Sequence, residues 1–159
     1  KLKELDEKFN LIKPGMTVLD LGAAPGSWLQ YAKERIGAEG KVIGIDLQEI
    51  EPIEGVKTIQ ADITNDLDLP NADLILSDLA PSTSGVKDVD QWRSIELNQA
   101  VEKIAEQVLK PGGVCVMKVF RGADFDDFLR SLKTKWETVK TAQVKASRDR
   151  SREVYILIS

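Results

Sequence analysis

The chain has 159 residues, of which 42% are hydrophobic and 30% charged, a composition typical of one globular domain. No apolar run is long enough to cross a bilayer, so a membrane span is excluded. The sequence contains no histidine and a single cysteine, which excludes Ser-His-Asp and Cys-His nucleophiles and an intrachain disulfide. Without histidine, the commonest metal ligand, no metal site is predicted. The lone cysteine and the absence of a signal-peptide pattern favour a cytoplasmic location.

The net charge of −4 is unevenly distributed along the chain. Residues 1–109 carry 11 basic and 20 acidic side chains, whereas residues 110–159 carry 11 basic and 6 acidic ones. The last third is therefore net positive, which makes it a candidate anion-binding surface. A solvated basic face without a partner is the alternative that composition leaves open.

Strand and helix patterns alternate along the whole chain. Residues 1–8 predict a charged amphipathic helix that begins without a cap, so we expect further residues upstream in the full-length protein. Apolar runs predict strands at 17–21, 41–46, 56–60, 73–77, 114–120, 138–144 and 154–158. Helical spacing predicts helices at 28–36, at about 91–109 and at 125–132. Pro111, Gly112 and Gly113 are expected to end the second of these helices.

This order predicts an α/β protein with a single domain over residues 1–159. Alternating strands and helices favour a mostly parallel sheet with helices on both faces, because right-handed crossovers place the helices there. The last two strands are joined by a short polar loop and should pair antiparallel. A seven-stranded sheet with one antiparallel strand resembles the Rossmann-like fold of class I methyltransferases.

Ionisable residues are predicted to gather at the edge formed by the carboxyl ends of the strands, where open parallel sheets bind ligands. The acids at or just past the first four strand ends are Asp20, Asp46, Asp62 and Asp78. Lys118 lies inside an apolar strand, where a charge is costly unless it is paired or functional. Glu153 begins the final, reversed strand and should lie at the same edge. Each acid taken alone also fits a loop or helix-cap role.

The segment DLGAAPGSW, residues 20–28, follows the first strand and opens the first crossover helix. Its small residues allow close approach of a ligand, and Pro25 removes an amide that a pyrophosphate would use, so the turn suits a ligand without phosphates. Asp46 is placed to accept hydrogen bonds from ribose hydroxyls, and Asp62 from an adenine amino group. A turn that serves packing alone, or a site for another nucleotide, remains the alternative.

Four motifs together resemble the FtsJ (RrmJ) family of ribosomal RNA 2′-O-methyltransferases over nearly the full length. They are DLGAAPGSW at 20–28, SDLAPSTSG at 77–85, MKVFRG at 117–122 and SREVYILI at 151–158. The resemblance implies a Lys-Asp-Lys-Glu catalytic set, here Lys1, Asp78, Lys118 and Glu153. It also implies S-adenosylmethionine as cofactor, with contacts from the turn and the strand ends: Gly22, Ala23, Pro25, Gly26, Trp28, Asp46, Asp62 and Asp78.

The implied reaction is methylation of a ribose 2′-hydroxyl, most simply of a uridine in large-subunit ribosomal RNA. Lys118 would act as the base that removes the hydroxyl proton or as the cation that stabilises the developing alkoxide. A structural ion pair at a strand end is the alternative for Lys118. Cys115 lies inside an apolar strand and is expected to be core packing, not the nucleophile of pyrimidine C5 methylation.

RNA is the expected partner, and the protein is predicted to be a monomer. Basic side chains near the ligand-binding edge are candidates for phosphate contacts: Arg121, Lys145, Arg148, Arg150 and Arg152. Trp92 is expected to pack its helix against the domain, with stacking of Trp92 and Arg93 on RNA bases as the alternative. Transfer RNA as substrate, or a non-catalytic RNA-binding role in ribosome assembly, are the alternatives that the sequence leaves open.

Overall fold

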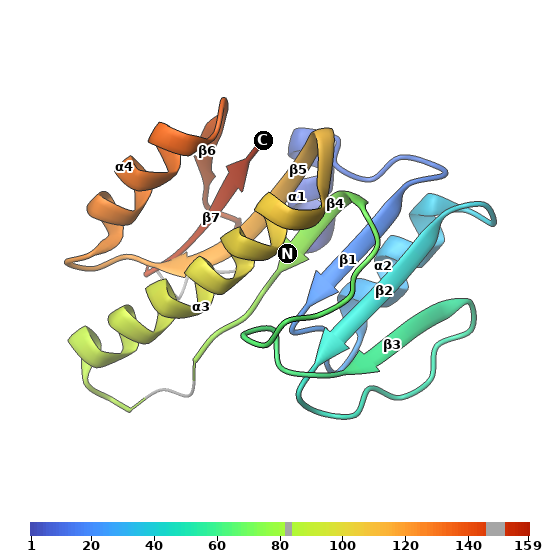
Figure 1. The fold of residues 1–159 in the computed structure, drawn as a ribbon, viewed down its shortest axis with the longest axis horizontal. Helices are drawn as coiled ribbons and strands as arrows, with labels where there is room; N and C mark the ends of the chain where they lie inside the picture. The colour runs from blue at the N-terminus through green and yellow to red at the C-terminus, as the bar shows by residue number, and fades with distance from the viewer. Residues whose placement is uncertain (82–83, 146–151) are drawn as a thin grey trace.

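The computed structural model describes residues 1–81, 84–145 and 152–159, which form one seven-stranded sheet flanked by helices (Figure 1). The strand order across the sheet is β3-β2-β1-β4-β5-β7-β6. The strands are β1 (Thr17–Leu21), β2 (Lys41–Asp46), β3 (Val56–Gln60), β4 (Ala72–Ser77), β5 (Leu109–Phe120), β6 (Val139–Ala142) and β7 (Glu153–Ile158). The helices are α1 (Leu2–Phe9), α2 (Ser27–Ile36), α3 (Lys87–Val108) and α4 (Phe125–Lys135).

The sheet has the predicted mixture of strand directions. β7 runs antiparallel to both β5 and β6, and the pairs among β1 to β5 are parallel. The arrowheads of β1, β2 and β3 point to the lower left in Figure 1, which marks the carboxyl edge of the parallel strands. Because β7 is reversed, its first residue, Glu153, lies at that same edge. The predicted α/β fold is therefore confirmed.

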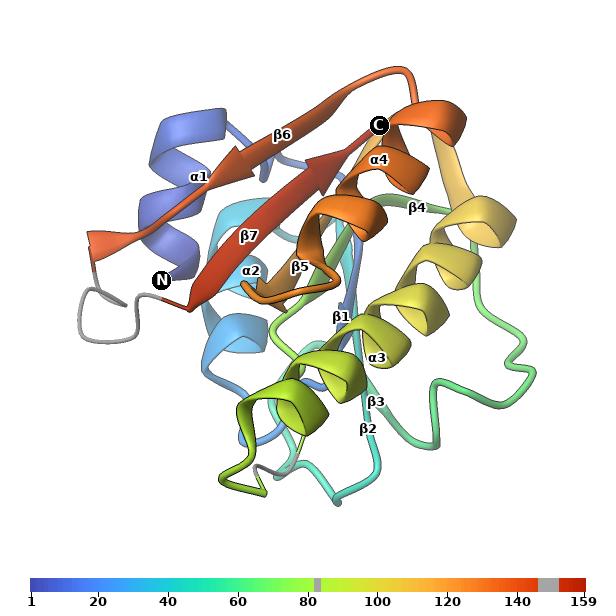
Figure 2. The ribbon, with the colours of Figure 1, turned by 90° about the vertical axis from the view of Figure 1, so that its left-hand side faces the viewer.

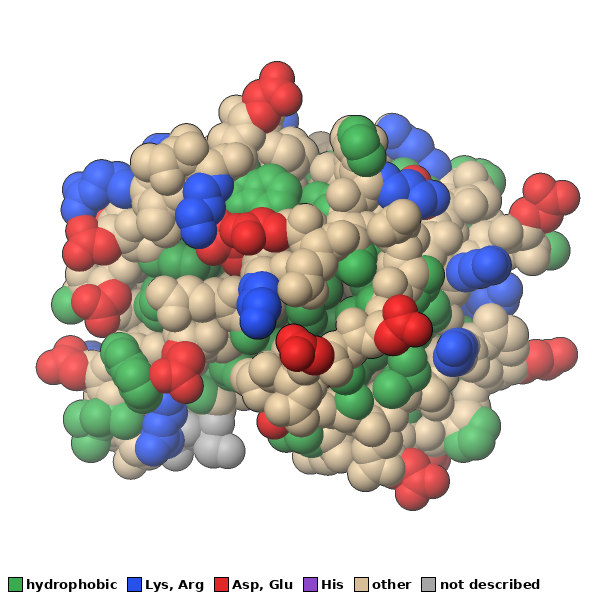
Figure 3. Space-filling view, viewed as in Figure 1, with side chains coloured by type: hydrophobic (Ala, Val, Ile, Leu, Met, Phe, Trp, Pro, Cys, Tyr) green, Lys and Arg blue, Asp and Glu red, His purple; other side chains and the backbone are tan. Residues whose placement is uncertain are grey.

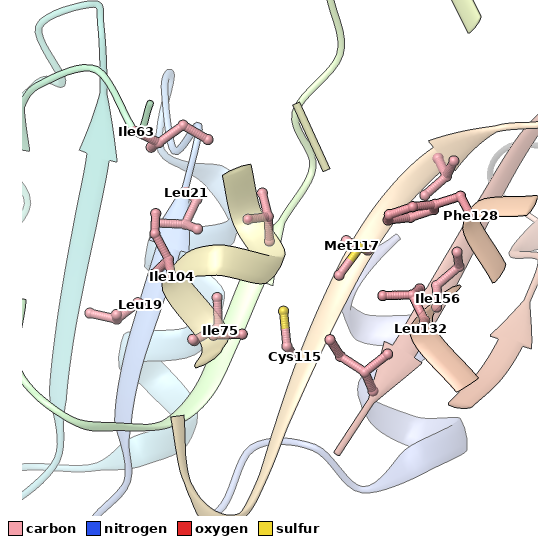
Figure 4. Packing of buried hydrophobic residues seen from close by; sticks show 14 of the residues in the cluster. Leu19, Leu21, Ile63, Ile75, Ile104, Cys115, Met117, Phe128, Leu132 and Ile156 are labelled. Atoms are coloured by element: carbon pink, nitrogen blue, oxygen red, sulfur yellow. The ribbon is translucent and has the colours of Figure 1, made fainter. Parts of the chain in front are cut away.

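The helices form one layer on each face of the sheet (Figure 2). Apolar side chains of α3 and α4 pack with Cys115, Met117 and Val119 of β5 in one core, and Figure 4 shows Phe128 and Leu132 of α4 beside this strand. α1 and α2 pack with the alternate strand residues in a second core on the opposite face. Side chains alternate along a strand, so Lys118 belongs to the face of α1 and α2.

Several element boundaries differ from the predictions, and the starts of α3 and β5 differ most. α3 begins at Lys87, about four residues before its predicted start. The apolar pattern did not extend to this end because the apolar side chains of the first turns, Val89 and Trp92, are exposed to solvent. Trp92 is 56% exposed, so the predicted packing role for this residue is wrong. With 22 residues α3 is the longest helix, yet neither it nor any other described helix is apolar enough to cross a bilayer.

The second difference concerns the start of β5. α3 ends at Val108, three residues before Pro111 and one residue before its predicted end, but β5 begins at Leu109 and not at Val114. Residues 111–113 lie where the register between β4 and β5 shifts, between the pairs Ala72–Leu109 and Leu74–Val114. These residues therefore follow the end of the helix, as predicted, and also form the irregular start of β5.

Candidate active site

The turn between β1 and α2 is held tightly against the end of β2. The amides of Gly22 and Ala23 both donate to the Ile45 carbonyl, at 2.7 and 3.1 Å. The Ala24 amide donates to Asp46 Oδ2 at 2.9 Å, and the Gln48 amide donates to Asp46 Oδ1 at 2.8 Å. Asp46, at the end of β2, therefore links the glycine-containing turn to the segment that follows β2.

Two glycines of this turn adopt backbone conformations that side chains disfavour. Gly22 has φ of 76°, and Gly26, which precedes α2, has φ of 128°. A Cβ atom on Gly22 would lie 2.3 Å from the Leu79 side chain, while one on Gly26 would lie 3.1 Å from Ile53. Gly22 thus lets the turn pack directly on the segment after β4, which carries Asp78.

Gly22→Ala is expected to destabilise the fold by about 2–4 kcal/mol, from overpacking against Leu79 added to the positive φ. Gly37→Ala is the matched control, because Gly37 also has a positive φ, 74°, but a Cβ there would meet nothing within 4 Å. The control should lose only about 1 kcal/mol. Urea unfolding of both variants measures the difference, and equal losses would show that the contact with Leu79 is unimportant.

The four predicted catalytic residues lie together in a continuous ion-paired network. Lys118 Nζ lies 3.5 Å from Asp78 Oδ1 and 3.8 Å from Glu153 Oε1. Glu153 Oε2 in turn accepts a hydrogen bond from Lys1 Nζ at 3.1 Å. Lys118 and Glu153 are buried, with 6% and 5% of their surfaces exposed, while Lys1 and Asp78 are half-buried. The network thus joins β5, β7, the end of β4 and the residue before α1.

Tyr155 is a member of this network that the sequence analysis did not single out. Its hydroxyl donates to Asp78 Oδ1 at 2.6 Å, and it pairs directly with Lys118 across the β5–β7 ladder. Burial, followed by the nearby Asp78, raises the pKa of Tyr155 far above its usual value, so the phenol stays a donor. Its ring lies 6.2 Å from that of Trp28 in α2. Its position two residues after Glu153 was the available signal, since alternation puts both on one face.

Asp20 also belongs to this site. The sequence placed it at the carboxyl edge of the sheet but did not indicate a role for it. Its side chain is buried, and Oδ2 has no hydrogen-bond partner among the described residues. Burial first, then the proximity of Asp78 and Asp46, raises its pKa well above 3.8. A buried carboxylate beside two others is costly unless a cation compensates it. Within the described ranges, no group of three or more carboxylate or cysteine side chains is arranged to hold a metal ion.

Asp62 lies two residues past β3 in a tight turn. Its Oδ1 accepts hydrogen bonds from the Thr64 hydroxyl at 2.7 Å and the Thr64 amide at 2.9 Å. These two bonds lower its pKa, the hydroxyl contributing more, so Asp62 is held ionised as an acceptor. The remaining predicted ligand-binding residues differ in exposure: Ala23 and Gly26 are buried, Trp28 is half-buried and Pro25 is exposed.

The predicted RNA-contacting residues are only partly brought together. Arg121 is exposed just past β5, with its guanidinium 5.8 Å from the Phe125 ring. Arg152 is half-buried, with its guanidinium 5.2 Å from the Phe120 ring. Lys145 is exposed, and its amide donates to Glu4 of α1 at 2.7 Å. Arg148 and Arg150 lie outside the described residues.

The chain matches the model of one known family over its whole length, residues 1–159, described as FtsJ-like methyltransferase. The chain belongs to this family. It is 46% identical to "Ribosomal RNA large subunit methyltransferase E" of Methanothrix thermoacetophila, aligning 99% of this chain with 64% of that protein. The namesake in Methylobacillus flagellatus is 45% identical, with 99% and 80% covered. The chain thus spans slightly under two thirds of the first relative and four fifths of the second.

Solved structures agree with this assignment. A crystal structure from Plasmodium falciparum, assigned as a ribosomal RNA methyltransferase, superposes with a TM-score of 0.89 at 32% identity, covering 99% of this chain and 93% of that one. Fibrillarin of Aeropyrum pernix, solved with S-adenosyl-L-methionine, superposes with a TM-score of 0.65 at 15% identity, covering 92% and 67%. At that identity the likeness shows the fold alone, so the roles of the site residues in this FtsJ-like chain must be argued from their own geometry.

Proposed function

We propose that this chain transfers the methyl group of S-adenosylmethionine to a ribose 2′-hydroxyl of large-subunit ribosomal RNA, most simply of a uridine. The observation that carries the proposal is the buried network of Lys118, Asp78 and Glu153 beside the β1–α2 turn. An ammonium with two carboxylates suits a reaction in which a hydroxyl loses a proton while its oxygen attacks carbon. The names of the two relatives supply the class of RNA.

The residues at the carboxyl edge fit this donor in charge and in hydrogen-bonding groups. S-adenosylmethionine, when bound, supplies an electrophilic methyl carbon on a sulfonium, and it also carries an ammonium group. The buried Asp20 carboxylate, with its unpaired Oδ2, provides the compensating charge for such a cation. Asp46 and Asp62 add carboxylate acceptors at the ends of β2 and β3 for hydroxyl and amino donors. The absence of phosphates in this donor agrees with Pro25 in the turn.

The protein's part in the reaction is to hold the acceptor and to manage its proton. Lys118 acts at the ribose oxygen, either as the base or as the cation that stabilises the alkoxide. Asp78 and Glu153 orient the Lys118 ammonium. The Tyr155 hydroxyl holds Asp78 and the Lys1 ammonium holds Glu153, each by a hydrogen bond. Alignment of the oxygen with the methyl carbon supplies several kcal/mol by positioning alone.

A different acceptor, the C5 carbon of a pyrimidine, is disfavoured by the structure. Such chemistry requires a reactive thiolate, and Cys115 is the chain's one cysteine. Its side chain is fully buried in the α3/α4 core (Figure 4), and burial raises the pKa of the thiol far above its usual value. It is therefore an inert packing residue.

The proposal is tested by transfer from radiolabelled S-adenosylmethionine to three substrates: large ribosomal subunits, protein-free large-subunit RNA and bulk transfer RNA. We expect transfer to one or both of the ribosomal substrates, with the modified position mapped by its resistance to alkaline cleavage, which a 2′-O-methyl group confers. If only transfer RNA is labelled, the substrate is transfer RNA and not ribosomal RNA. RNA binding without label in any substrate would instead indicate a non-catalytic assembly factor.

RNA binding is expected to weaken steeply with salt. The log–log slope should be about −0.7 for each phosphate neutralised on single-stranded RNA. Arg121→Ala should weaken binding and reduce the magnitude of this slope by about 0.7, the value for one phosphate contact. Arg121 is exposed just past the carboxyl end of β5, where RNA could reach it. Lys110→Ala, at the opposite end of the same strand, is the control. Acidic and basic side chains are interspersed on the face that carries α3 (Figure 3), so we place the RNA at the carboxyl edge and not across that face. A slope unchanged by Arg121→Ala would remove this contact.

A further inference from the structure

The strand that carries Lys118 extends beyond its neighbour β4. The last paired residues of the two strands are Ser77 and Met117, after which the chain leaves β4 towards Asp78. On its other edge β5 stays paired with β7 as far as Phe120 and Glu153. The backbone of residues 118–120 therefore has a strand partner on one side only. Buried backbone groups without partners are costly, so other groups must take the place of β4.

Three side chains of α3 fill this gap, and we call Gln91, Ser94 and Asn98 the α3 polar face. Asn98 Nδ2 donates to the Lys118 carbonyl at 2.8 Å. Ser94 Oγ accepts from the Phe120 amide at 3.1 Å, and Gln91 Nε2 donates to the Phe120 carbonyl at 3.0 Å. The three side chains thus make, group by group, the bonds that a neighbouring strand would make.

The α3 polar face is unusual in its burial and in its spacing. The three residues are only 1–3% exposed, although buried polar side chains are costly unless they are hydrogen-bonded. Asn98 Oδ1 has no hydrogen-bond partner among the described residues, so the amide nitrogen makes the bonds of this side chain. Their intervals of three and four residues place them on one side of the helix. Asn98 Nδ2 also donates to the Ser94 carbonyl at 2.9 Å, which ties the side chain to its own helix.

The turn after β5 is built around the same helix face. Gln91 Oε1 accepts from the Asp124 amide at 2.8 Å, so this one side chain bonds both sides of the turn. A Cβ atom on Gly122 would lie 2.1 Å from Gln91 Cγ. The glycine of the segment MKVFRG is therefore required for the close approach of Gln91, and the end of β5 is clamped from Lys118 to Asp124.

We infer that Gln91, Ser94 and Asn98 are positioning residues that set the place of Lys118 in the active site by holding its backbone. The inference rests on the proposed function for its consequence, since Lys118 must stay aligned with Asp78 and Glu153. Without the Asn98 bond, the Lys118 carbonyl is left unpaired in the core and the strand end must shift to find a partner. Displacements of about 1 Å at a reacting group can reduce turnover by about 100-fold.

The test compares Asn98→Leu, which keeps the size of the side chain but cannot donate, with Trp136→Phe. The control removes another bond of the same helix, from Trp136 Nε1 to the buried Glu102 carboxylate at 2.9 Å, one helical turn beyond Asn98 and not bonded to the Lys118 backbone. We expect Asn98→Leu to lower kcat about 10- to 100-fold and to leave the dissociation constant of S-adenosylmethionine within about twofold. Trp136→Phe should leave kcat within about twofold, although it also lowers the unfolding midpoint.

A second pair of variants applies if Asn98→Leu does not fold. Ser94→Ala removes the hydroxyl that accepts from Phe120, whereas Ser94→Thr retains it. We expect kcat to fall in the first and to be largely kept in the second. An unchanged kcat in Asn98→Leu or Ser94→Ala, or an equal loss in Trp136→Phe, overturns the inference.

A readout without turnover separates this inference from the proposed function. The Lys118 ammonium can be followed by nuclear magnetic resonance in protein with labelled lysine, its signal assigned as the one missing from Lys118→Ala. We expect Asn98→Leu to move this signal and Trp136→Phe to leave it in place. If the wild-type protein is inactive but the two variants affect the signal as expected, the proposed reaction is contradicted and the positioning role is not. If Asn98→Leu leaves the signal unmoved, the positioning role is contradicted.

Discussion

Lys118→Ala is expected to reduce methyl transfer by about 10²- to 10⁴-fold while donor binding stays nearly unchanged. The group removed acts on the acceptor oxygen, whereas the donor is held by residues at the ends of β1, β2 and β3. Single-turnover transfer and calorimetric titration with S-adenosylmethionine measure the two effects separately. Near-normal turnover would defeat the assignment of Lys118.

The variant should remain folded, although it removes one member of a buried ion-paired network. Leaving a buried charge without any partner is strongly destabilising, by about 3–5 kcal/mol. Here Asp78 retains the Tyr155 hydroxyl and Glu153 retains Lys1, so neither carboxylate is left alone. Lys118→Arg separates the two possible roles, because arginine stays charged and cannot serve as a base. Activity in that variant would assign Lys118 as the cation, and its loss with the fold intact favours the base.

Asp20→Asn is expected to stabilise the donor-free protein and to weaken donor binding about 10- to 100-fold, the range for a lost bond to a charged group. The stability effect has a definite sign with pH. Because the folded-state pKa of Asp20 is raised, its ionisation costs stability as pH rises from about 3.8 towards the folded-state value. Above that range the wild type carries the full cost, which the asparagine variant avoids. The thermal midpoint should rise by about 2–4 °C for each kcal/mol recovered.

Proton release upon donor binding tests the same carboxyl in the wild-type protein. A cationic ligand beside Asp20 favours its ionised form, so binding near the raised pKa should release a proton to the buffer. Titration calorimetry in buffers of different ionisation enthalpy measures that proton, and Asp20→Asn should abolish it. Thr17→Ser, a mild change at the start of the same strand and far from the edge, serves as the control. Unchanged donor affinity in Asp20→Asn would show that the cation is held elsewhere.

The strand ends were the part of the site that sequence reasoning could predict. Asp46, Asp78, Lys118 and Glu153 are charges that interrupt or end apolar runs, and a parallel sheet brings such positions to one edge. Tyr155 escaped notice because an aromatic residue in an apolar strand looks like packing. Only the register with Lys118 and the bond to Asp78 give it a role.

The helix in front of the sheet was harder to predict than the sheet itself. The apolar pattern of α3 was found in its second half, but its first half buries polar side chains and exposes Trp92. Hydrophobic periodicity cannot identify a buried face made of Gln91, Ser94 and Asn98. These residues are buried because the end of β5 lacks a partner strand, which depends on the length of β4 and so on tertiary structure.

The bond between Lys1 and Glu153 joins residues 152 positions apart, so the catalytic network closes across almost the whole described sequence. Contacts of such long separation form late in folding, after the loop-closure entropy has been offset by more local pairing. A nascent or proteolytically shortened chain without β7 would lack both Glu153 and Tyr155. Such a chain could retain the strands proposed to bind the donor, but it would lack one of the two carboxylates that contact Lys118 and the hydroxyl that holds the other.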